Sequence, residues 1–94
     1  MVIGVCTMEL SLPAATSLKD KRQVIKSLMA RLRNEFNISV AEVGAQDQKQ
    51  WAVVGVACVS SDRDYAHGLL SHVVNWVQKN RLDCDLADYQ VQIM

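Results

Sequence analysis

Residues Ser17–Phe36 read SLKDKRQVIKSLMARLRNEF, and the rest of the fold is best worked out from this stretch. Its apolar residues recur at spacings of three and four, which is the pattern of an amphipathic helix. Ser17 followed by Asp20 fits a capping pattern in which the two side chains satisfy backbone N–H groups of the first turn. The stretch therefore predicts a helix, with Asn37 closing it in the left-handed conformation.

The predicted helix is strongly basic. It holds six of the ten Lys and Arg residues of the chain and only two acidic residues, Asp20 and Glu35, although the formal net charge of the protein is zero. At 100° per residue, four of these cations share a sector about 60° wide beside the apolar face. The four residues of this basic flank are Lys19, Arg22, Lys26 and Arg33.

Strands are predicted on both sides of this helix. The β-branched run Val2–Leu10 precedes it, and Pro13 prevents that strand from continuing. Ile38–Val43 and Gln50–Val59 follow the helix as two strands of a hairpin, joined by the polar turn Gly44–Lys49.

A second helix, about Arg63–Asn80, is capped from Ser60–Asp62 and has apolar residues at a period of 3.6. Arg81–Asp88 is a polar connection, and Tyr89–Met94 alternates as a last strand. The order β-α-β-β-α-β predicts an α+β fold, the ferredoxin-like sandwich. Its four-stranded antiparallel sheet has the order 4-1-3-2 with two helices on one face, and residues 1–94 form a single domain.

Composition limits the class of protein. A chain of 94 residues with 50% hydrophobic and 21% charged residues suits one globular domain. No apolar run approaches the roughly 20 residues that cross a membrane, and the first residues lack the basic region of a signal peptide. We expect a cytoplasmic protein without a membrane partner.

The three cysteines give no sign of a disulfide framework. Cys6, Cys58 and Cys84 are odd in number and have no CxxC spacing, and the first two lie within apolar runs. Buried thiols are expected, and no metal or cofactor is indicated.

The topology collects polar residues at one end of the sheet. Glu9 and Glu42 fall on strands separated by one central strand, so they are expected about 10 Å apart. They are interpreted either as a carboxylate pair for acid–base chemistry or as rim carboxylates paired with the cations of the first helix. Lys21 projects near the apolar side of that helix, where Glu9, Glu42 or the acidic segment Asp83–Asp88 suits it better than a phosphate.

The uncovered face of the sheet is predicted to expose valine and isoleucine, because Gln50–Val59 is apolar on both sides. An exposed apolar patch tends to find a partner, so a homodimer formed through this face is expected.

Three classes of function are compatible with these features. The basic flank favours binding to the phosphates of RNA or of a ribosomal particle. Recognition of bases is not expected, because the first strand has no aromatic residue on which a base could stack. The alternative is that the basic flank binds no ligand and is a solvated helix face, whose charge Asp83–Asp88 partly neutralises. A dimeric regulatory or assembly module with a small effector is the second class. An enzyme is the least favoured, because no nucleophile grouping, phosphate-binding loop or CxxC follows the first strand.

Two segments give the chain a family resemblance. GVCTMELSLPAATSLKDKRQVIKSLMARLRNEFNISVAEVG, combined with WAVVGVACVSSD, resembles the YlxP-like family, a bacterial group of small uncharacterised proteins. The resemblance covers most of the chain and implies the ferredoxin-like fold. Members are often encoded beside translation and ribosome-maturation factors, which implies an association with RNA or the ribosome.

The resemblance carries four candidates of unassigned duty to this chain: Lys19, Lys21, Arg22 and Glu42. Members commonly have a histidine at the position of Ser11 and a tryptophan at that of Lys49. In this sequence the tryptophan is Trp51, two residues later.

Overall fold

The computed structural model of the protein describes residues 1–80 and 83–94, and within them it has six elements. They are β1 (Val2–Ser11), α1 (Leu18–Glu35), β2 (Ser39–Gly44), β3 (Trp51–Ser60), α2 (Arg63–Lys79) and β4 (Asp85–Ile93). The strands form one antiparallel sheet in the order β2-β3-β1-β4. This is the order 4-1-3-2 counted from the other edge, so the predicted ferredoxin-like α+β fold is confirmed.

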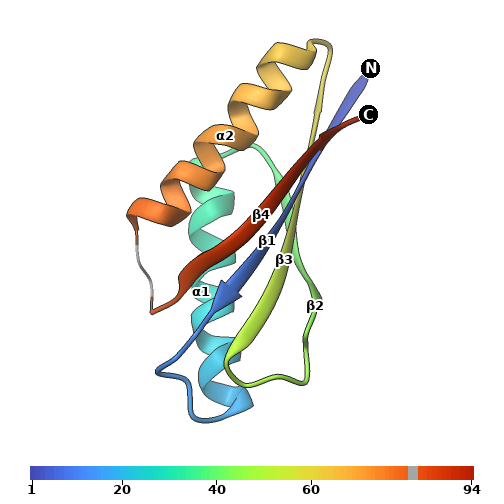
Figure 1. The fold of residues 1–94 in the computed structure, drawn as a ribbon. Coiled ribbons are helices and arrows are strands. Elements are labelled where there is room, and N and C mark those ends of the chain that lie inside the picture. The colour runs from blue at the N-terminus through green and yellow to red at the C-terminus, as the bar shows by residue number, and fades with distance from the viewer. Residues whose placement is uncertain (81–82) are drawn as a thin grey trace.

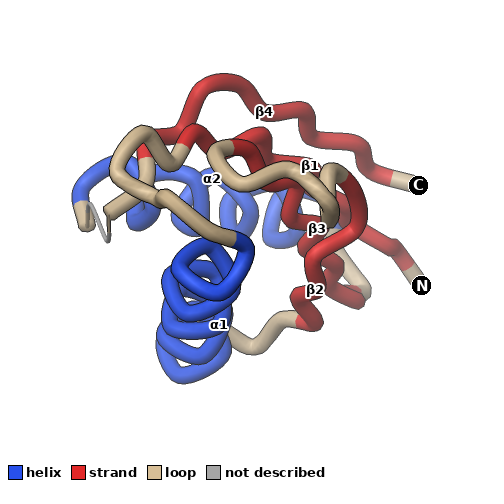
Figure 2. Tube along the Cα trace, turned by 90° about the horizontal axis from the view of Figure 1, so that it is seen from below, coloured by secondary structure: helices blue, strands red, loops and turns tan. Residues whose placement is uncertain are grey.

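Both helices lie on one side of the sheet (Figure 2). α2 packs against β1 and β4, and α1 packs against β2 at the other edge. The opposite side, called the open face below, carries neither helix (Figure 2). Among the described residues, no helix is both long and apolar enough to cross a membrane.

Figure 1 shows which segments meet at each end of the sheet. The N- and C-termini lie side by side at one end. At the other end, the polar end, the start of α1 lies close to the β2–β3 loop, and the start of β4 lies beside the end of β1 (Figure 1). This is the grouping that the sequence predicted.

The core lies between the sheet and the helices. Alternate residues of the two central strands point into it, including Met8 and Leu10 of β1 and Val54 of β3, all fully buried. Leu28 of α1 and Leu70 of α2 close the core from the helix side. Burial of each such side chain contributes about 1.5–3 kcal/mol, which makes this layer the main source of stability.

The ends of α1 follow the prediction only in part. Ser17 is the N-cap, and its Oγ accepts a hydrogen bond from the backbone N of Asp20 at 3.0 Å, as predicted. The carboxylate of Asp20 does not complete the expected capping box: it accepts from the backbone N and the hydroxyl of Thr16 instead, at 3.1 and 2.6 Å. The prediction for Asn37 was wrong. Phe36 ends the helix in an extended conformation (φ −133°), and Asn37 does not have a positive φ.

The bounds of the strands agree with the prediction except for β4. The first three strands begin and end within one residue of the expected positions. β4 begins at Asp85 rather than Tyr89, because Leu86 and Asp85 pair with the end of β1. Ala87 is left without a partner in β1, as a bulge. Part of the predicted polar connection, residues 81–82, lies outside the described residues.

Candidate functional site

A buried lysine occupies the polar end, in the first turn of α1. Lys21 is fully buried, and its Nζ donates hydrogen bonds to the carbonyl oxygens of Ala45 at 2.7 Å and Trp51 at 3.1 Å. The carbonyl oxygen of Gln46 accepts a longer one, at 3.4 Å. An ammonium group leaves water at a cost of several kcal/mol, which these oxygens of the β2–β3 loop and the start of β3 offset. Lys21 thus fastens the loop to the helix.

Glu42 completes the environment of this ammonium. Its Oε2 lies 3.1 Å from Nζ of Lys21, and the side chain as a whole is 19% exposed. Oε2 is buried and has no other polar partner among the described residues, so Lys21 is what compensates its charge. Glu42 was predicted as one of the suitable partners of Lys21, and the structure brings the two together.

The β2–β3 loop is strained where Lys21 holds it. Ala45 has a φ of 57°, in the left-handed region that costs a non-glycine residue about 1–2 kcal/mol. Its carbonyl oxygen accepts both from Lys21 and from the backbone N of Gln48 at 3.0 Å. These two hydrogen bonds keep Ala45 in a conformation that an isolated loop would avoid.

Glu9 does not join this site, so of the two interpretations the carboxylate pair for acid–base chemistry is wrong. Glu42 is opposite Val54 and Glu9 is opposite Val53 in the ladders of β3. Successive side chains of a strand point to opposite faces, so Glu42 faces the helices and Glu9 the open face. Glu9 instead lies opposite Asp88 of β4 and lines a small hollow on the open face. Acid–base chemistry shared by Glu9 and Glu42 has no geometric basis.

The basic flank lies on the side of α1 that faces the edge strand β2. Lys19, Arg22 and Lys26 are exposed. Arg33 in the same sector is exposed as well, but its Nη2 donates to the carbonyl oxygen of Val40 in β2 at 3.0 Å. This contact, which no local pattern indicates, places the sector beside β2 and gives Arg33 a structural task.

The acidic segment lies away from the basic flank. Asp85 and Asp88 belong to β4, which forms the edge opposite β2. Three steps of about 4.8 Å across the sheet separate the two edges. Within residues 1–80 and 83–94, Lys21 and Glu42 form the only ion pair closer than 4.0 Å. No carboxylate of the described β4 strand therefore forms an ion pair with Lys19, Arg22 or Lys26.

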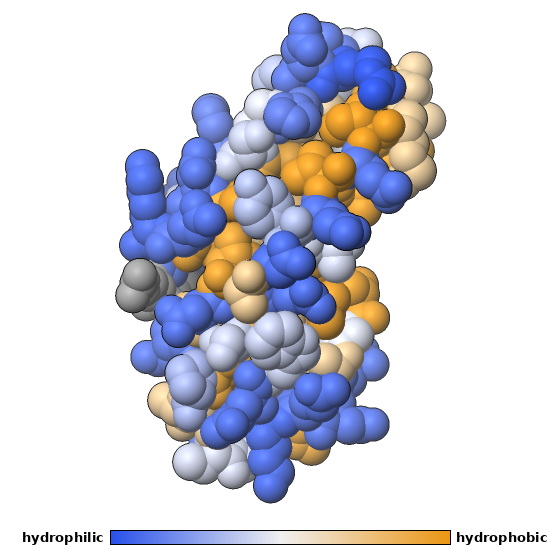
Figure 3. All heavy atoms as spheres, viewed as in Figure 1, coloured by the Kyte–Doolittle hydropathy of each residue, from blue (hydrophilic) through white to orange (hydrophobic). Residues whose placement is uncertain are grey.

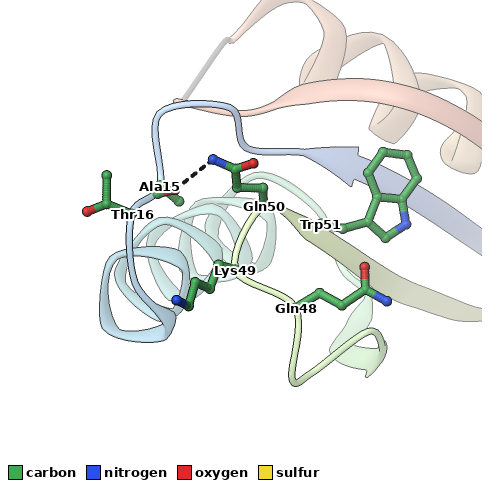
Figure 4. Close-up of a pocket in the computed structure, with 6 residues that line it drawn as sticks. All are labelled: Ala15, Thr16, Gln48, Lys49, Gln50 and Trp51. Carbon is green, nitrogen blue, oxygen red and sulfur yellow. Dashed lines mark hydrogen bonds between the residues drawn. The ribbon is translucent and has the colours of Figure 1, made fainter.

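The two loops of the polar end form an open depression, shown in Figure 4. The side-chain amide of Gln50 donates to the carbonyl oxygens of Pro13 at 3.2 Å and Ala15 at 3.1 Å, which ties the β1–α1 loop to the β2–β3 loop. In this depression the side chain of Lys49 extends toward α1, and the ring of Trp51 points away from α1 (Figure 4). The double contact of Gln50 was not predicted, because its partners are far away in the sequence.

The cysteines are placed as the sequence predicted. Cys6, Cys58 and Cys84 are buried and none forms a disulfide. Burial raises the pKa of the Cys6 thiol to about 11, which keeps it protonated and unreactive at neutral pH. Among the described residues, no group of three or more His, Cys, Asp or Glu is arranged to hold a metal ion.

Comparison with known proteins gives a family without an assigned activity. Residues 3–91 match the family described as "Protein of unknown function (DUF503)". Over 76 residues the chain is 38% identical to the uncharacterised protein YlxP of Bacillus subtilis (strain 168), covering 81% of this chain and 83% of that protein.

Two solved structures resemble the fold with little sequence identity. The de novo designed protein Foldit4 has a TM-score of 0.54 and 12% identity, covering 100% of this chain and 97% of that one. The VAO-type flavoprotein MtVAO615 of Myceliophthora thermophila C1 has a TM-score of 0.57 and 12% identity. The match covers 99% of this chain but 16% of the flavoprotein. At this identity the likeness concerns the fold alone.

Proposed function

The chain belongs to the DUF503 family of proteins of unknown function, and within it we propose a cytoplasmic, non-enzymatic accessory factor that binds the phosphate backbone of RNA, free or in a ribosomal particle. The observation that carries this proposal is the exposed set Lys19, Arg22 and Lys26 on one side of α1. At a rise of 1.5 Å per residue, these three cations span about 10 Å along the helix. That length matches two or three consecutive phosphates of an extended strand.

The surroundings of the basic flank support an electrostatic contact. Arg33 holds the same side of the helix against β2, so the flank is presented by a rigid element. The acidic residues of β4 lie at the other edge of the sheet. In β1 and β3 the open face has one aromatic side chain, Trp51, at the first residue of β3. Stacking of several bases on the sheet is therefore not part of the proposal.

The test compares two triple variants of equal charge. Lys19→Gln, Arg22→Gln and Lys26→Gln are combined in one protein. The control combines Arg31→Gln, Arg63→Gln and Lys79→Gln, three cations that are also exposed but lie outside the basic flank. Fluorescence anisotropy with a 20-nucleotide RNA measures affinity between about 50 and 200 mM salt, and co-sedimentation measures binding to ribosomal particles.

We expect log K of the unaltered protein to fall with log salt at a slope of about −2 to −3, because each phosphate contact contributes about −0.7 to −0.9. The flank variant should lose this binding and the control variant should keep it. Binding to particles without binding to the free RNA would assign the site to assembled ribosomal RNA. Equal loss in both variants, or no affinity for either ligand at 50 mM salt, would refute the proposal.

A second candidate is a dimeric module formed through the open face, and the exposed valines of that face favour it. Val43 is 58%, Val59 68% and Ile3 37% exposed. From strand lengths and spacings, this face measures about 550 Å² per copy, or about 1,100 Å² for two copies, which reaches the lower range of specific interfaces. A dimer by light scattering that Val43→Asp with Val59→Asp converts to a monomer would support it. A monomer before any substitution would exclude it, and with it an effector site between the copies.

A further inference from the structure

The two edge strands of the sheet, β2 and β4, differ in how their outward backbone groups are protected. On β2, the carbonyl oxygen of Val40 accepts from Arg33 at 3.0 Å and that of Glu42 from the amide of Gln46 at 3.5 Å. Natural proteins close exposed edges in this way, or with proline, lysine or a bulge. On β4, the bulge at Ala87 interrupts the first part of the edge. The remaining part, YQVQI, has neither proline nor lysine.

The ladder between β1 and β4 shows which groups of this segment are unused. Ile3 and Met94 exchange both backbone hydrogen bonds, at 3.1 and 2.8 Å. In an antiparallel pair such residues alternate with residues whose N–H and C=O point away from the neighbour. By the register, Gln92 and Gln90 bond to β1, whereas Ile93, Val91 and Tyr89 direct their backbone groups outward.

Those outward groups have almost no partners. The N–H of Tyr89 donates to the carboxylate of Asp88 at 2.8 Å. For Val91 and Ile93, within the described residues, no hydrogen bond reaches the outward N–H or C=O. Figure 3 views the molecule from the side of β4 and shows apolar side chains exposed among polar ones there. Tyr89 is 46% exposed.

We infer that Tyr89–Ile93 of β4 pairs antiparallel with the same segment of a second copy, so that two sheets join into one. The two-fold axis passes between Val91 and Val91 of the second copy, which places Tyr89 opposite Ile93. Each pair joins an aromatic or β-branched residue to a β-branched one, the combination that stabilises antiparallel strands. Because the N–H of Tyr89 is used by Asp88, the other outward groups form roughly four backbone hydrogen bonds across the axis.

The charges of β4 favour a second copy in this register over other registers. Asp85 and Asp88 precede the paired segment, so each copy keeps its carboxylates beyond the end of the shared ladder. The two Asp88 residues lie about 20 Å apart, at about 3.3 Å per residue, where salt screens their repulsion. A shift that moved the axis to Asp88 would place the two Asp88 carboxylates directly opposite one another. The arrangement is also isologous, as in most two-subunit proteins.

Hydrogen exchange of the unaltered protein gives the first test, because it needs no substitution. The amides of Val91 and Ile93 have no acceptor among the described residues of one copy, so they should exchange slowly only when the strands are paired. We expect their protection to rise with protein concentration, together with a dimer mass in sedimentation equilibrium. Exchange at the rate of an unstructured peptide at concentrations where a dimer is present would overturn the inference.

The second test removes one outward donor and leaves the side chain. A synthetic segment that begins at Cys84 is joined to residues 1–83 by native chemical ligation, with N-methylvaline at position 91. The matched control is the same ligated protein with ordinary valine. We expect the control to be a dimer and the methylated protein to be a folded monomer by circular dichroism and sedimentation. A dimer that survives methylation but is lost in Val43→Asp with Val59→Asp would assign the contact to the open face and refute the β4 pairing.

Discussion

The ammonium of Lys21 lies 3.1 Å from Oε2 of Glu42 and joins the first turn of α1 to the edge strand β2. The same ammonium binds carbonyl oxygens on either side of the β2–β3 turn, at Ala45 and Trp51. One buried charge thus positions a helix, a loop and two strands. This pair also limits the basic flank, because Lys21 is removed from the set of cations that a ligand can reach.

Replacing Lys21 by Met should destabilise the protein by about 3–5 kcal/mol, because it leaves a buried carboxylate oxygen and several carbonyl groups without their donor. Glu42→Gln should cost less, about 1–2 kcal/mol, since the ammonium keeps its carbonyl partners. Urea unfolding at pH 7 measures both values. A cost below 1 kcal/mol for Lys21→Met would show that solvent enters the site and replaces these contacts.

Arg33→Ala should destabilise the protein by about 1–2 kcal/mol through loss of the hydrogen bond to Val40. Arg31→Ala on the same helix is the matched control, because Arg31 is exposed and lies on another side of α1. Its effect should stay within about 0.5 kcal/mol, as for other exposed positions. Thermal unfolding of the two variants side by side provides the comparison. Equal midpoints would mean that the contact to Val40 contributes nothing measurable.

Two glycines should respond to alanine in opposite directions. A Cβ at Gly4 would lie 2.9 Å from Sγ of Cys58 and 3.0 Å from Cδ1 of Leu70, so Gly4→Ala should cost about 1–3 kcal/mol by overpacking. A Cβ at Gly68, in the middle of α2, meets nothing within 4 Å. Gly68→Ala should therefore gain about 0.5–1 kcal/mol from helix propensity. Chemical unfolding checks both signs, and a stable Gly4→Ala variant would contradict the packing at this site.

Acid should weaken the start of α1. The hydroxyl and backbone N–H of Thr16 lower the pKa of Asp20 below its ordinary value of 3.8, with smaller contributions from Ser17 and Lys19. A carboxyl group whose pKa is lower in the folded state contributes stability above pH 3.8 and loses it as the pH falls through the folded pKa. Asp20→Asn should therefore be less stable than the unaltered protein at pH 6.5, and the difference should shrink by pH 3. A difference independent of pH would refute the role of the charge.

Much of the fold is predictable because its local signals agree with its tertiary contacts. The period of α1, its N-cap at Ser17 and the hairpin after it all indicate the observed order of elements. The position of Lys21 near the apolar side of α1 is visible too, since it shares a helix face with Ile25 and Leu28, but its full burial was not predicted. What is not local is the set of carbonyl groups that Lys21 meets, because these depend on how the β2–β3 loop packs.

The predictions that were wrong also failed because tertiary contacts decide the structure at those positions. Val2–Leu10 is apolar on both faces, so its sequence does not reveal which face of the sheet holds Glu9. Only the register with β3 shows that Glu9 and Glu42 lie on different faces. Asp85–Asp88 has the composition of a loop, but pairing with the end of β1 makes it a strand. Asn37 suits a left-handed cap, yet Phe36 is extended and leads directly into β2.

The hydrogen bond from Arg33 to Val40 has a consequence for how large an assembly can become. A sheet with two accessible edges can add copies at both ends without limit and form a fibre. Here one edge is capped by a side chain of the same chain, so a copy that pairs through β4 presents only capped edges to the solution. An assembly formed by pairing through β4 therefore contains two copies of the chain. Arg33 on α1, together with Gln46 in the β2–β3 loop, would thus limit the pairing through β4 to two copies.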